Sequence, residues 1–331
     1  MKAFTLVTPR SLDQALDVLA ANGAKHANAP ARVLAGGQDL LTEMKERLVE
    51  PEKLVALQGL PGLSDIAFEA SGACTIGALV TLAELESHPG VRERLRVLGE
   101  AAATVASPQI RSVGTVGGNL MQRPRCWYYR LENAKCLKKG GDECFSYAGM
   151  SKYNAILGGG PSYIVHPSDL APALVALGAE VTLKSRTNER RVALEQFYTL
   201  PAQGDVKKET VLASDEVLTH VHVPAPERGM KSTWHKFRER GSFDFALSAV
   251  ALCLWSDAGV VRRASVVLGG VAPIPWRAKG VEAALAGARL DAASIEKAAA
   301  VATAGAEPLD HNGYKVPLTR GLVVRALQSL A

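Results

Sequence analysis

Two short glycine-rich stretches have the residue types needed to bind phosphate. One reads Ala35-Gly-Gly-Gln-Asp-Leu40, and the other reads Arg111-Ser-Val-Gly-Thr-Val-Gly-Gly-Asn119. Glycine lets the backbone adopt conformations closed to other residues and approach a ligand closely, so successive N–H groups can converge on an anion. Two such loops suit a ligand with two phosphates, while each loop taken alone is equally consistent with an ordinary glycine turn.

A cluster of thiols follows the second loop directly. Three of the five cysteines, Cys126, Cys136 and Cys144, fall within this short span, and Cys74 and Cys253 lie far from it in sequence. In a chain without a recognisable secretory signal, clustered thiols favour metal or redox chemistry over disulfide bonds. The aromatic residues among them suit a shielded centre, a local hydrophobic core or a partner interface.

The elements around the first loop are arranged as a strand, a loop and a helix. Residues 32–35 have the pattern of a short strand, and residues 40–48 have that of a helix. A helix start adds unpaired N–H groups and a favourable dipole, so this order is typical of phosphate sites. The glycine spacing matches neither the dinucleotide fingerprint with three spaced glycines nor a P-loop.

The rest of the chain reads as a mixture of helices and strands. Ser11 followed by Gln14 resembles a capping box for a helix over residues 12–19 that ends at Gly23. Asp257-Ala-Gly259 is a plausible turn between two strands of a hairpin. Strands are expected within 54–80, around 181–183 and 217–223, and over 244–255 and 260–269, with helices over most of 82–105 and over 281–286, 295–304 and 318–330.

Length and composition indicate a globular protein of about two domains. The 331 residues are 47% hydrophobic and 21% charged, with a formal net charge of +5. The basic residues are scattered, so nucleic acid is not indicated as a partner. No run of about 18 apolar residues predicts a membrane span. His220 and His222 share one face of a strand, and a surface pair explains them better than a metal site.

Four motifs in order make the chain resemble the FAD-binding subunit of molybdenum hydroxylases, the family of xanthine dehydrogenase, carbon monoxide dehydrogenase and bacterial aldehyde oxidoreductases. The motifs are 35–40, 110–120, His166-Pro-Ser-Asp-Leu-Ala-Pro-Ala-Leu174 and 266–277. The resemblance covers essentially the whole chain and implies an α+β fold. It implies an FAD-binding domain (PCMH type) over 1–223, with subdomains of about 1–60 and 61–223. A linker at 224–229 would lead to a smaller α/β C-terminal domain over 230–331, like that of the CO dehydrogenase flavoprotein.

The resemblance also implies which residues bind FAD. The two loops would wrap the diphosphate, and Thr115 and Asn119 would add side-chain hydrogen bonds. Asp169 matches an acidic residue that meets the cofactor, although it could equally cap the helix toward Gly178. Lys236 matches a position near the flavin, although a lysine on a strand is more often solvated. The full set is Ala35, Gly36, Gly37, Gln38, Asp39, Leu40, Ala106, Ile110, Gly114, Thr115, Gly117, Gly118, Asn119, Asp169 and Lys236.

The cysteine-rich insertion, residues 121–160, narrows the subgroup. It resembles the segment that carries a 4Fe-4S cluster in 4-hydroxybenzoyl-CoA reductase and the periplasmic aldehyde oxidoreductase. Such a cluster takes four thiolates, and Cys126, Cys136 and Cys144 would supply three. The fourth position is Ser162, whose hydroxyl is a harder and poorer ligand for this cluster. Two alternatives stay open: a bound cluster, or an ordered loop of thiols inherited from cluster-binding relatives.

The function implied by the resemblance is electron transfer. A molybdopterin-binding large subunit would oxidise an aldehyde or an N-heterocycle, and a 2Fe-2S small subunit would pass electrons to FAD here and then to an external acceptor. No side chain is required as a catalytic nucleophile or base. The alternatives are a stand-alone FAD oxidase of the vanillyl-alcohol type and a cofactor-free assembly protein. The expected compartment is the cytoplasm, or the periplasm if a signal-bearing partner exports the subunit.

Overall fold

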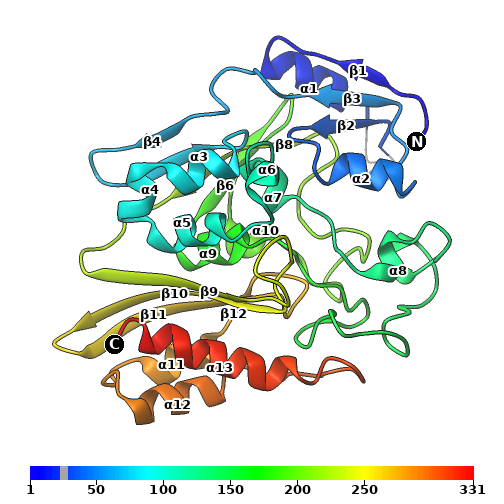
Figure 1. Cartoon of the computed structure of the whole chain (residues 1–331). Helices are drawn as coiled ribbons and strands as arrows, with labels where there is room; N and C mark the ends of the chain where they lie inside the picture. Colours follow the sequence, from blue (N-terminus) through cyan, green and yellow to red (C-terminus); the bar gives the residue numbers. More distant parts are fainter. Residues whose placement is uncertain (23–28) are drawn as a thin grey trace.

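The computed structural model describes residues 1–22 and 29–331. Three separate sheets and the helices between them form successive layers (Figure 1). Mixed helices and sheets confirm the α+β class. The predicted helix end at Gly23 lies outside the described residues.

The first sheet carries the first glycine loop. Its three parallel strands follow the order β1-β3-β2. Their bounds are β1 (Thr5–Val7), β2 (Ala31–Leu34) and β3 (Lys53–Ala56), and the helices are α1 (Leu12–Ala20) and α2 (Leu40–Lys45). The expected strand, loop and helix around residues 35–40 are therefore confirmed, with a helix that stops earlier than residue 48.

The capping box expected at the start of α1 forms only in part. The Ser11 hydroxyl accepts the Gln14 backbone N–H at 3.3 Å. The Gln14 side chain accepts the backbone N–H of Arg10 at 2.8 Å, one residue before the cap. The cap still begins the helix, and Ala15, Leu16 and Leu19 are buried on the face that packs on the sheet.

A five-stranded antiparallel sheet forms the middle of the molecule, in the order β4-β5-β8-β6-β7. The strands are β4 (Ile66–Phe68), β5 (Cys74–Gly77), β6 (Glu180–Lys184), β7 (Glu189–Ala193) and β8 (Val217–Val223). The helices of this part are α3 (Leu82–Ser87), α4 (Pro89–Arg94), α5 (Arg96–Ala103), α6 (Pro108–Arg111), α7 (Val116–Leu120), α9 (Leu170–Ala176) and α10 (Leu194–Phe197). The segment 82–105 is thus helical as predicted, with its first break before Pro89.

The C-terminal part is a four-stranded antiparallel sheet with helices on its outer face, in the order β12-β11-β10-β9. The strands are β9 (Met230–Phe237), β10 (Ser248–Asp257), β11 (Val260–Gly269) and β12 (Trp276–Arg277), and the helices are α11 (Lys279–Leu285), α12 (Ala292–Ala300) and α13 (Lys315–Gln328). The predicted hairpin turn is confirmed, with positive φ at Ala258 and Gly259. The predicted strand over 244–255 begins later, because Asp244 instead accepts hydrogen bonds from Arg240.

The β10 strand is buried on both faces. Ala249, Ala251 and Cys253 belong to the core shared with α5, α9 and the five-stranded sheet. The alternate residues Val250, Leu252 and Leu254 pack in a second core with α11, α12 and α13. Because strand side chains alternate between faces, this strand joins the two cores, as its place between the helix layers in Figure 1 shows.

The cysteine-rich insertion has little regular structure. It contains α8 (Trp127–Arg130) and the short 3-10 helix η1 (Leu137–Lys139), and it lies beside α2 at the edge of the molecule (Figure 1). Trp127, Leu131 and Tyr147 are more than half exposed, so the expected aromatic core of the insertion is only partly formed.

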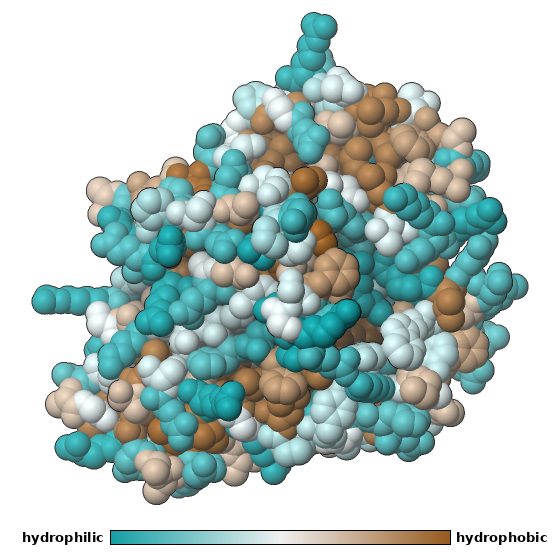
Figure 2. All heavy atoms as spheres, in the orientation of Figure 1, coloured by the Kyte–Doolittle hydropathy of each residue, from teal (hydrophilic) through white to brown (hydrophobic). Residues whose placement is uncertain are grey.

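The visible face of the protein mixes polar and apolar side chains (Figure 2). Apolar groups gather at its top, over the three-stranded sheet, where Phe4 and Leu6 are exposed. Within residues 1–22 and 29–331, no helix has both the length and the apolar character needed to cross a membrane.

Candidate functional site

The two glycine loops lie directly against each other. A Cβ atom added to Gly36 would lie 2.0 Å from the carbonyl oxygen of Val113, a separation that no side chain tolerates. Gly117 lies at the start of α7. A Cβ added there would lie 2.9 Å from the Cβ of Ala78, the residue after β5. Glycine is therefore required so that the loops can approach each other and β5 closely.

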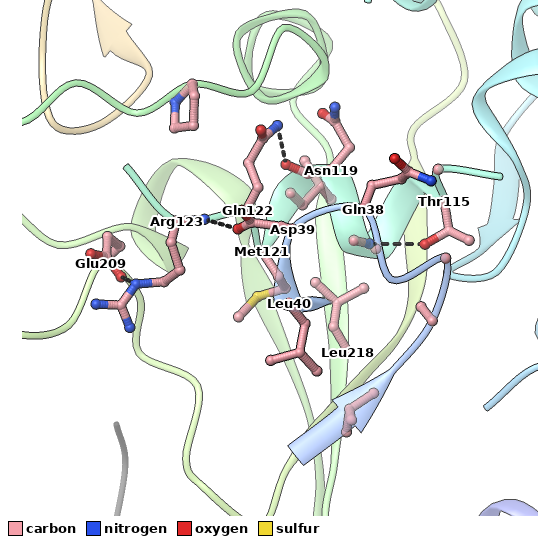
Figure 3. A pocket seen from close by; sticks show the side chains of 18 of the residues that line it. Gln38, Asp39, Leu40, Thr115, Asn119, Met121, Gln122, Arg123, Glu209 and Leu218 are labelled. Carbon is pink, nitrogen blue, oxygen red and sulfur yellow. Dashed lines mark hydrogen bonds and ion pairs between the residues drawn. The ribbon is translucent and has the colours of Figure 1, made fainter. Parts of the chain in front are cut away.

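A single cavity of about 890 Å³ lies between these loops. All the residues assigned to FAD from the sequence line it: 35–40, Ala106, Ile110, Gly114, Thr115, Gly117, Gly118, Asn119, Asp169 and Lys236. Figure 3 shows Gln38, Thr115 and Asn119 around this space. A second set of residues also lines the cavity, although the sequence did not indicate them as cofactor contacts. They are Ala78, Leu79, Arg123, Arg125, His166, Glu209, Phe243 and Phe245.

The second loop enters α7 through a side-chain cap. The Thr115 hydroxyl accepts the backbone N–H of Gly118 at 3.1 Å, which places the hydroxyl at the helix start (Figure 3). Asn119 is held from the other side, because the Ser168 hydroxyl donates to its Oδ1 at 2.6 Å. Both polar side chains are buried and fixed in orientation at the cavity wall.

Asp169 does not cap the helix α9, contrary to one of the two expectations. Its side chain makes no capping hydrogen bond. The neighbouring Ser168 hydroxyl instead accepts the N–H of Ala171 at 3.0 Å. The carboxylate of Asp169 is thereby left to face Lys236.

Asp169 and Lys236 form a buried ion pair at the cavity wall. The Lys236 Nζ lies 2.6 Å from Asp169 Oδ2 and donates a second hydrogen bond to the carbonyl of Thr104 at 3.1 Å. The side chain of Lys236 is only 2% exposed, which rules out the alternative of a solvated lysine. Burial raises the pKa of Asp169, and the ammonium group of Lys236 opposes that rise.

Asp39 is in the first loop, but its carboxylate faces the cysteine-rich insertion. It accepts the backbone N–H of Arg123 at 2.6 Å and pairs with Arg125 at 2.9 Å and Arg130 at 2.8 Å. The arginines of the insertion were available in the sequence as a signal, since three of them fall within the eleven positions after the second loop. Their partner could not be read from the sequence.

His166 is a buried imidazole at the cavity wall. Its ring is 4.4 Å from that of Tyr198, and its Nε2 has no hydrogen-bond partner among the described residues. Burial lowers the pKa of His166 from 6.5 to about 4, so the ring is neutral at neutral pH. The motif His166-Pro-Ser-Asp marked this segment, but no role was expected for the histidine.

The low pKa of His166 makes stability depend on pH. The folded protein binds fewer protons at this ring than the unfolded chain does, so stability is lost as pH falls from about 6.5 toward 4. The full loss is about 3 kcal/mol in unfolding free energy. We expect His166→Asn to remove this part of the pH dependence in denaturant titrations at pH 7 and pH 4.5. An unchanged slope would contradict the assignment.

The cysteines and histidines outside the cavity have other contacts. Cys136 is buried and Cys126 and Cys144 are partly buried, all as free thiols. The Cys126 Sγ accepts from Asn154 at 3.8 Å, and the Cys144 Sγ lies 3.1 Å from the Ser146 hydroxyl. In the part of the chain that the structure describes, no three His, Cys, Asp or Glu side chains meet in a metal-ion geometry.

His220 and His222 are hydrogen-bonded within the middle of the fold. The His222 ring bonds Thr75 at 3.2 Å and Thr182 at 2.8 Å. The His220 Nε2 bonds the carbonyl oxygen of Gly62 at 3.0 Å. His222 is therefore bonded within its own sheet, and His220 is bonded to a neighbouring loop.

The fold and the site define the class of protein: an α+β chain in which two glycine-rich backbone loops meet at one cavity. Residues 2–226 match the family model of the FAD binding domain in molybdopterin dehydrogenase, and residues 232–330 match the CO dehydrogenase flavoprotein C-terminal domain. The chain belongs to this family of molybdopterin dehydrogenase FAD-binding proteins.

Individual relatives agree with the family. The chain is 37% identical to the aldehyde oxidoreductase FAD-binding subunit PaoB of Escherichia coli, over 77% of this chain and 79% of the relative. It is 28% identical to the carbon monoxide dehydrogenase medium chain of Hydrogenophaga pseudoflava, over 98% of this chain and 96% of the relative.

Solved structures are similar over the whole fold. The carbon monoxide dehydrogenase structure from Hydrogenophaga pseudoflava matches with a TM-score of 0.77 at 28% identity, covering 99% of this chain and 96% of that one. Quinoline 2-oxidoreductase from Pseudomonas putida 86 matches with a TM-score of 0.75 at 26% identity, covering 99% and 98%. The order of an FAD-binding part followed by a C-terminal part is therefore confirmed.

Proposed function

We propose that this chain is the FAD-carrying electron-transfer subunit of a multi-subunit molybdenum hydroxylase that oxidises an aldehyde or an N-heterocycle. The observation that carries the proposal is the meeting of both glycine loops in one cavity, in a chain of this family. Bound FAD would supply the exchange between one-electron donors and a two-electron acceptor. The protein's part is to bind, orient and shield it.

The residues of the cavity suit each part of that task. The backbone of residues 35–40 and 114–119 would hold the diphosphate, because these loops approach closely only through glycine. Thr115 and Asn119 would add fixed polar contacts. The Asp169–Lys236 ion pair would place one negative and one positive group at the cavity wall, because β9 carries Lys236 to the cavity.

The domain division follows from the same proposal. We assign residues 1–223 to the FAD-binding domain, with subdomains of about 1–60 and 61–223, and residues 230–331 to the C-terminal domain. The three-stranded and five-stranded sheets fall in the first part, and the four-stranded sheet falls in the second. The cavity is lined from both domains, because Lys236, Phe243 and Phe245 belong to the second.

The partners are a molybdopterin-binding large subunit and a 2Fe-2S small subunit. Relatives are named as a medium chain or an FAD-binding subunit, which are names for one component of a larger enzyme. The cytoplasm is the compartment we propose, because all five cysteines are free thiols. Co-purification of two further subunits with the tagged chain tests the partnership.

A visible absorption spectrum of the purified chain tests the function. Flavin bands that are released on denaturation and identified as FAD by chromatography are the expected result. A colourless preparation that binds no added FAD would reject the proposal in favour of the assembly protein. Turnover of a phenolic or alcohol substrate by the chain alone would favour the stand-alone oxidase of the vanillyl-alcohol type.

We further propose a 4Fe-4S cluster on the insertion, held by Cys126, Cys136 and Cys144 with Ser162 at the fourth position. The Cys126 thiol has a raised pKa, chiefly through burial and also through the neighbouring Cys144. Ser162 is 1% exposed, so its hydroxyl is enclosed rather than solvated. The influence of Cys144 on this pKa places Cys144 near Cys126, whereas no three His, Cys, Asp or Glu side chains of the described residues meet in a metal-ion geometry, so the cluster would have to draw its ligands together.

We expect Ser162→Cys to increase the iron retained by the purified protein, because thiolate is the softer ligand. The wild-type chain would lose iron during aerobic purification, and the variant would retain about four iron and four sulfide ions per chain. Iron and sulfide analysis after anaerobic reconstitution is the measurement. The control for an added thiol elsewhere in the insertion is Ser151→Cys, because the Ser151 hydroxyl lies 3.4 Å from His311. Absence of iron from wild type and variant alike would establish the thiols as structural.

A further inference from the structure

The cysteine-rich insertion makes hydrogen bonds and ion pairs with two separate walls of the cavity. One wall is the first glycine loop with α2, and the other is the segment 205–210, both of which line the cavity. These walls are distant in sequence. Figure 3 shows Arg123 of the insertion between them, with its backbone near Asp39 and its side chain near Glu209.

The contacts with the first wall centre on Asp39. Its Oδ1 is shared by Arg125 at 2.9 Å and Arg130 at 2.8 Å, and its Oδ2 accepts the Arg123 N–H. One turn further along α2, the Tyr129 hydroxyl donates to Glu43 at 2.9 Å. Asp39 and Arg130 have side chains that are 15% and 11% exposed, so solvent screens this pairing only weakly.

The contacts with the second wall centre on Glu209. Arg123 lies 3.0 Å from its Oε2, and Lys138 lies 2.6 Å from its Oε1. The Lys138 Nζ also donates to the carbonyl of Val206 at 2.8 Å. Lys138 is 2% and Glu209 is 8% exposed in their side chains, so this pair is buried too.

Arg130 is a residue at which a positioning role can be distinguished from direct contact with the ligand. Among the described residues that line the cavity, Arg130 is not included, whereas its partner Asp39 is. The Arg130 guanidinium also donates to the carbonyls of Pro124 and Arg123, at 2.8 and 3.2 Å, so it is fixed within the insertion. The ion-pair partners of Arg130 are Asp39 and, at 3.5 Å, Glu46, and of these two only Asp39 is among the described residues that line the cavity. Any effect of Arg130 on a ligand there must therefore pass through the protein, and Asp39 is its contact at the cavity wall.

We propose that the insertion is a clasp across the FAD cavity, and that Arg130 is a positioning residue that holds the first glycine loop in its binding conformation through Asp39. The inference rests on the proposed function, because FAD is the ligand. A loop that is already ordered loses less conformational entropy when the ligand binds, so the clasp raises affinity. Paired buried charges suit this task because their geometry is specific and removal of one partner is costly.

The test compares FAD affinity of the full chain with and without the clasp. FAD is removed from wild type, Arg130→Met and Arg130→Lys, and its dissociation constant is measured by quenching of flavin fluorescence. We expect about a tenfold weaker affinity for Arg130→Met and partial recovery for Arg130→Lys, which keeps the charge. The matched control is Arg47→Met, because Arg47 joins the same two segments through an exposed pair with Glu132 at 3.4 Å.

The outcomes distinguish this inference from the proposed function. If wild type binds no FAD, the proposed function fails. If wild type binds FAD and Arg130→Met binds it within twofold of wild type, the clasp is wrong and the function stands. A double variant of Arg130→Met with Asp39→Asn should bind no more weakly than the weaker single variant, and additive losses would overturn the connection. Should Arg130→Met fail to fold, Lys138→Met tests the second wall in the same assay, because Lys138 pairs with Glu209 and is not among the described residues that line the cavity. About a tenfold loss is expected, and an unchanged affinity would overturn the clasp.

Discussion

Replacement of Lys236 by methionine is expected to lower the free energy of unfolding by about 3–5 kcal/mol, because it leaves the buried carboxylate of Asp169 without its counter-ion. The loss of unfolding free energy in Lys236→Met should grow as pH rises. Burial already raises the pKa of Asp169, and without Lys236 the folded protein retains the proton to higher pH than the unfolded chain does. Denaturant unfolding at pH 5 and pH 8 measures both effects.

Two controls separate the buried pair from a general effect of losing a lysine. Lys152→Met breaks an exposed pair with Glu239 and should leave stability nearly unchanged, because solvent screens the pair. The double variant Lys236→Met with Asp169→Asn should recover much of the lost stability, because no unpaired charge remains buried. A loss of under about 1 kcal/mol for Lys236→Met at pH 8 would show that the pair does not have this role.

Substitution of Gly36 by alanine is expected to weaken FAD binding by about a hundredfold. The added Cβ would meet the carbonyl oxygen of Val113 at 2.0 Å, so backbone must move against backbone and the two loops must separate. Overpacking of this kind costs about 1–3 kcal/mol, and each 1.4 kcal/mol of binding energy is a tenfold change. Flavin content after purification and the dissociation constant of added FAD are the measurements.

Gly204→Ala is the matched control for Gly36→Ala. A Cβ at Gly204 would meet no atom within 4 Å, so FAD affinity should be unchanged. Thermal unfolding of the same samples compares their stability, and the control should be as stable as wild type or slightly more stable. Retention of full FAD affinity by Gly36→Ala would refute the argument that contact between the two loops forms the site.

The parts of the site that the sequence predicted depend on local patterns. The strand, glycine loop and helix around residues 35–40 follow from neighbouring residues, and their conformation is set by glycine and by the helix start. The recognition of several motifs in order then placed the loops in one family, which no single loop could do. Hence part of the cavity lining could be named in advance from residues spread over the chain, while Arg123, Glu209 and Phe245 could not.

The parts that the sequence could not predict depend on contacts between distant segments. Asp169 has an equally good local role as a helix cap, and only the approach of β9 shows that it pairs with Lys236 instead. Asp39 lies in the expected loop, but its carboxylate is directed to arginines more than eighty residues later. Propensity and spacing carry no information about such pairs, because they arise from the packing of whole elements.

The position of β10 between two cores limits how the chain can be divided. Its odd-numbered residues complete the interior of the first domain, and its even-numbered residues anchor the terminal helices. Residues 1–223 alone would expose a broad apolar surface, and they would also lack Lys236 of β9. A chain severed between residues 223 and 230 would separate Lys236 from the rest of the cavity, so its two fragments should bind FAD only when they reassemble along β10.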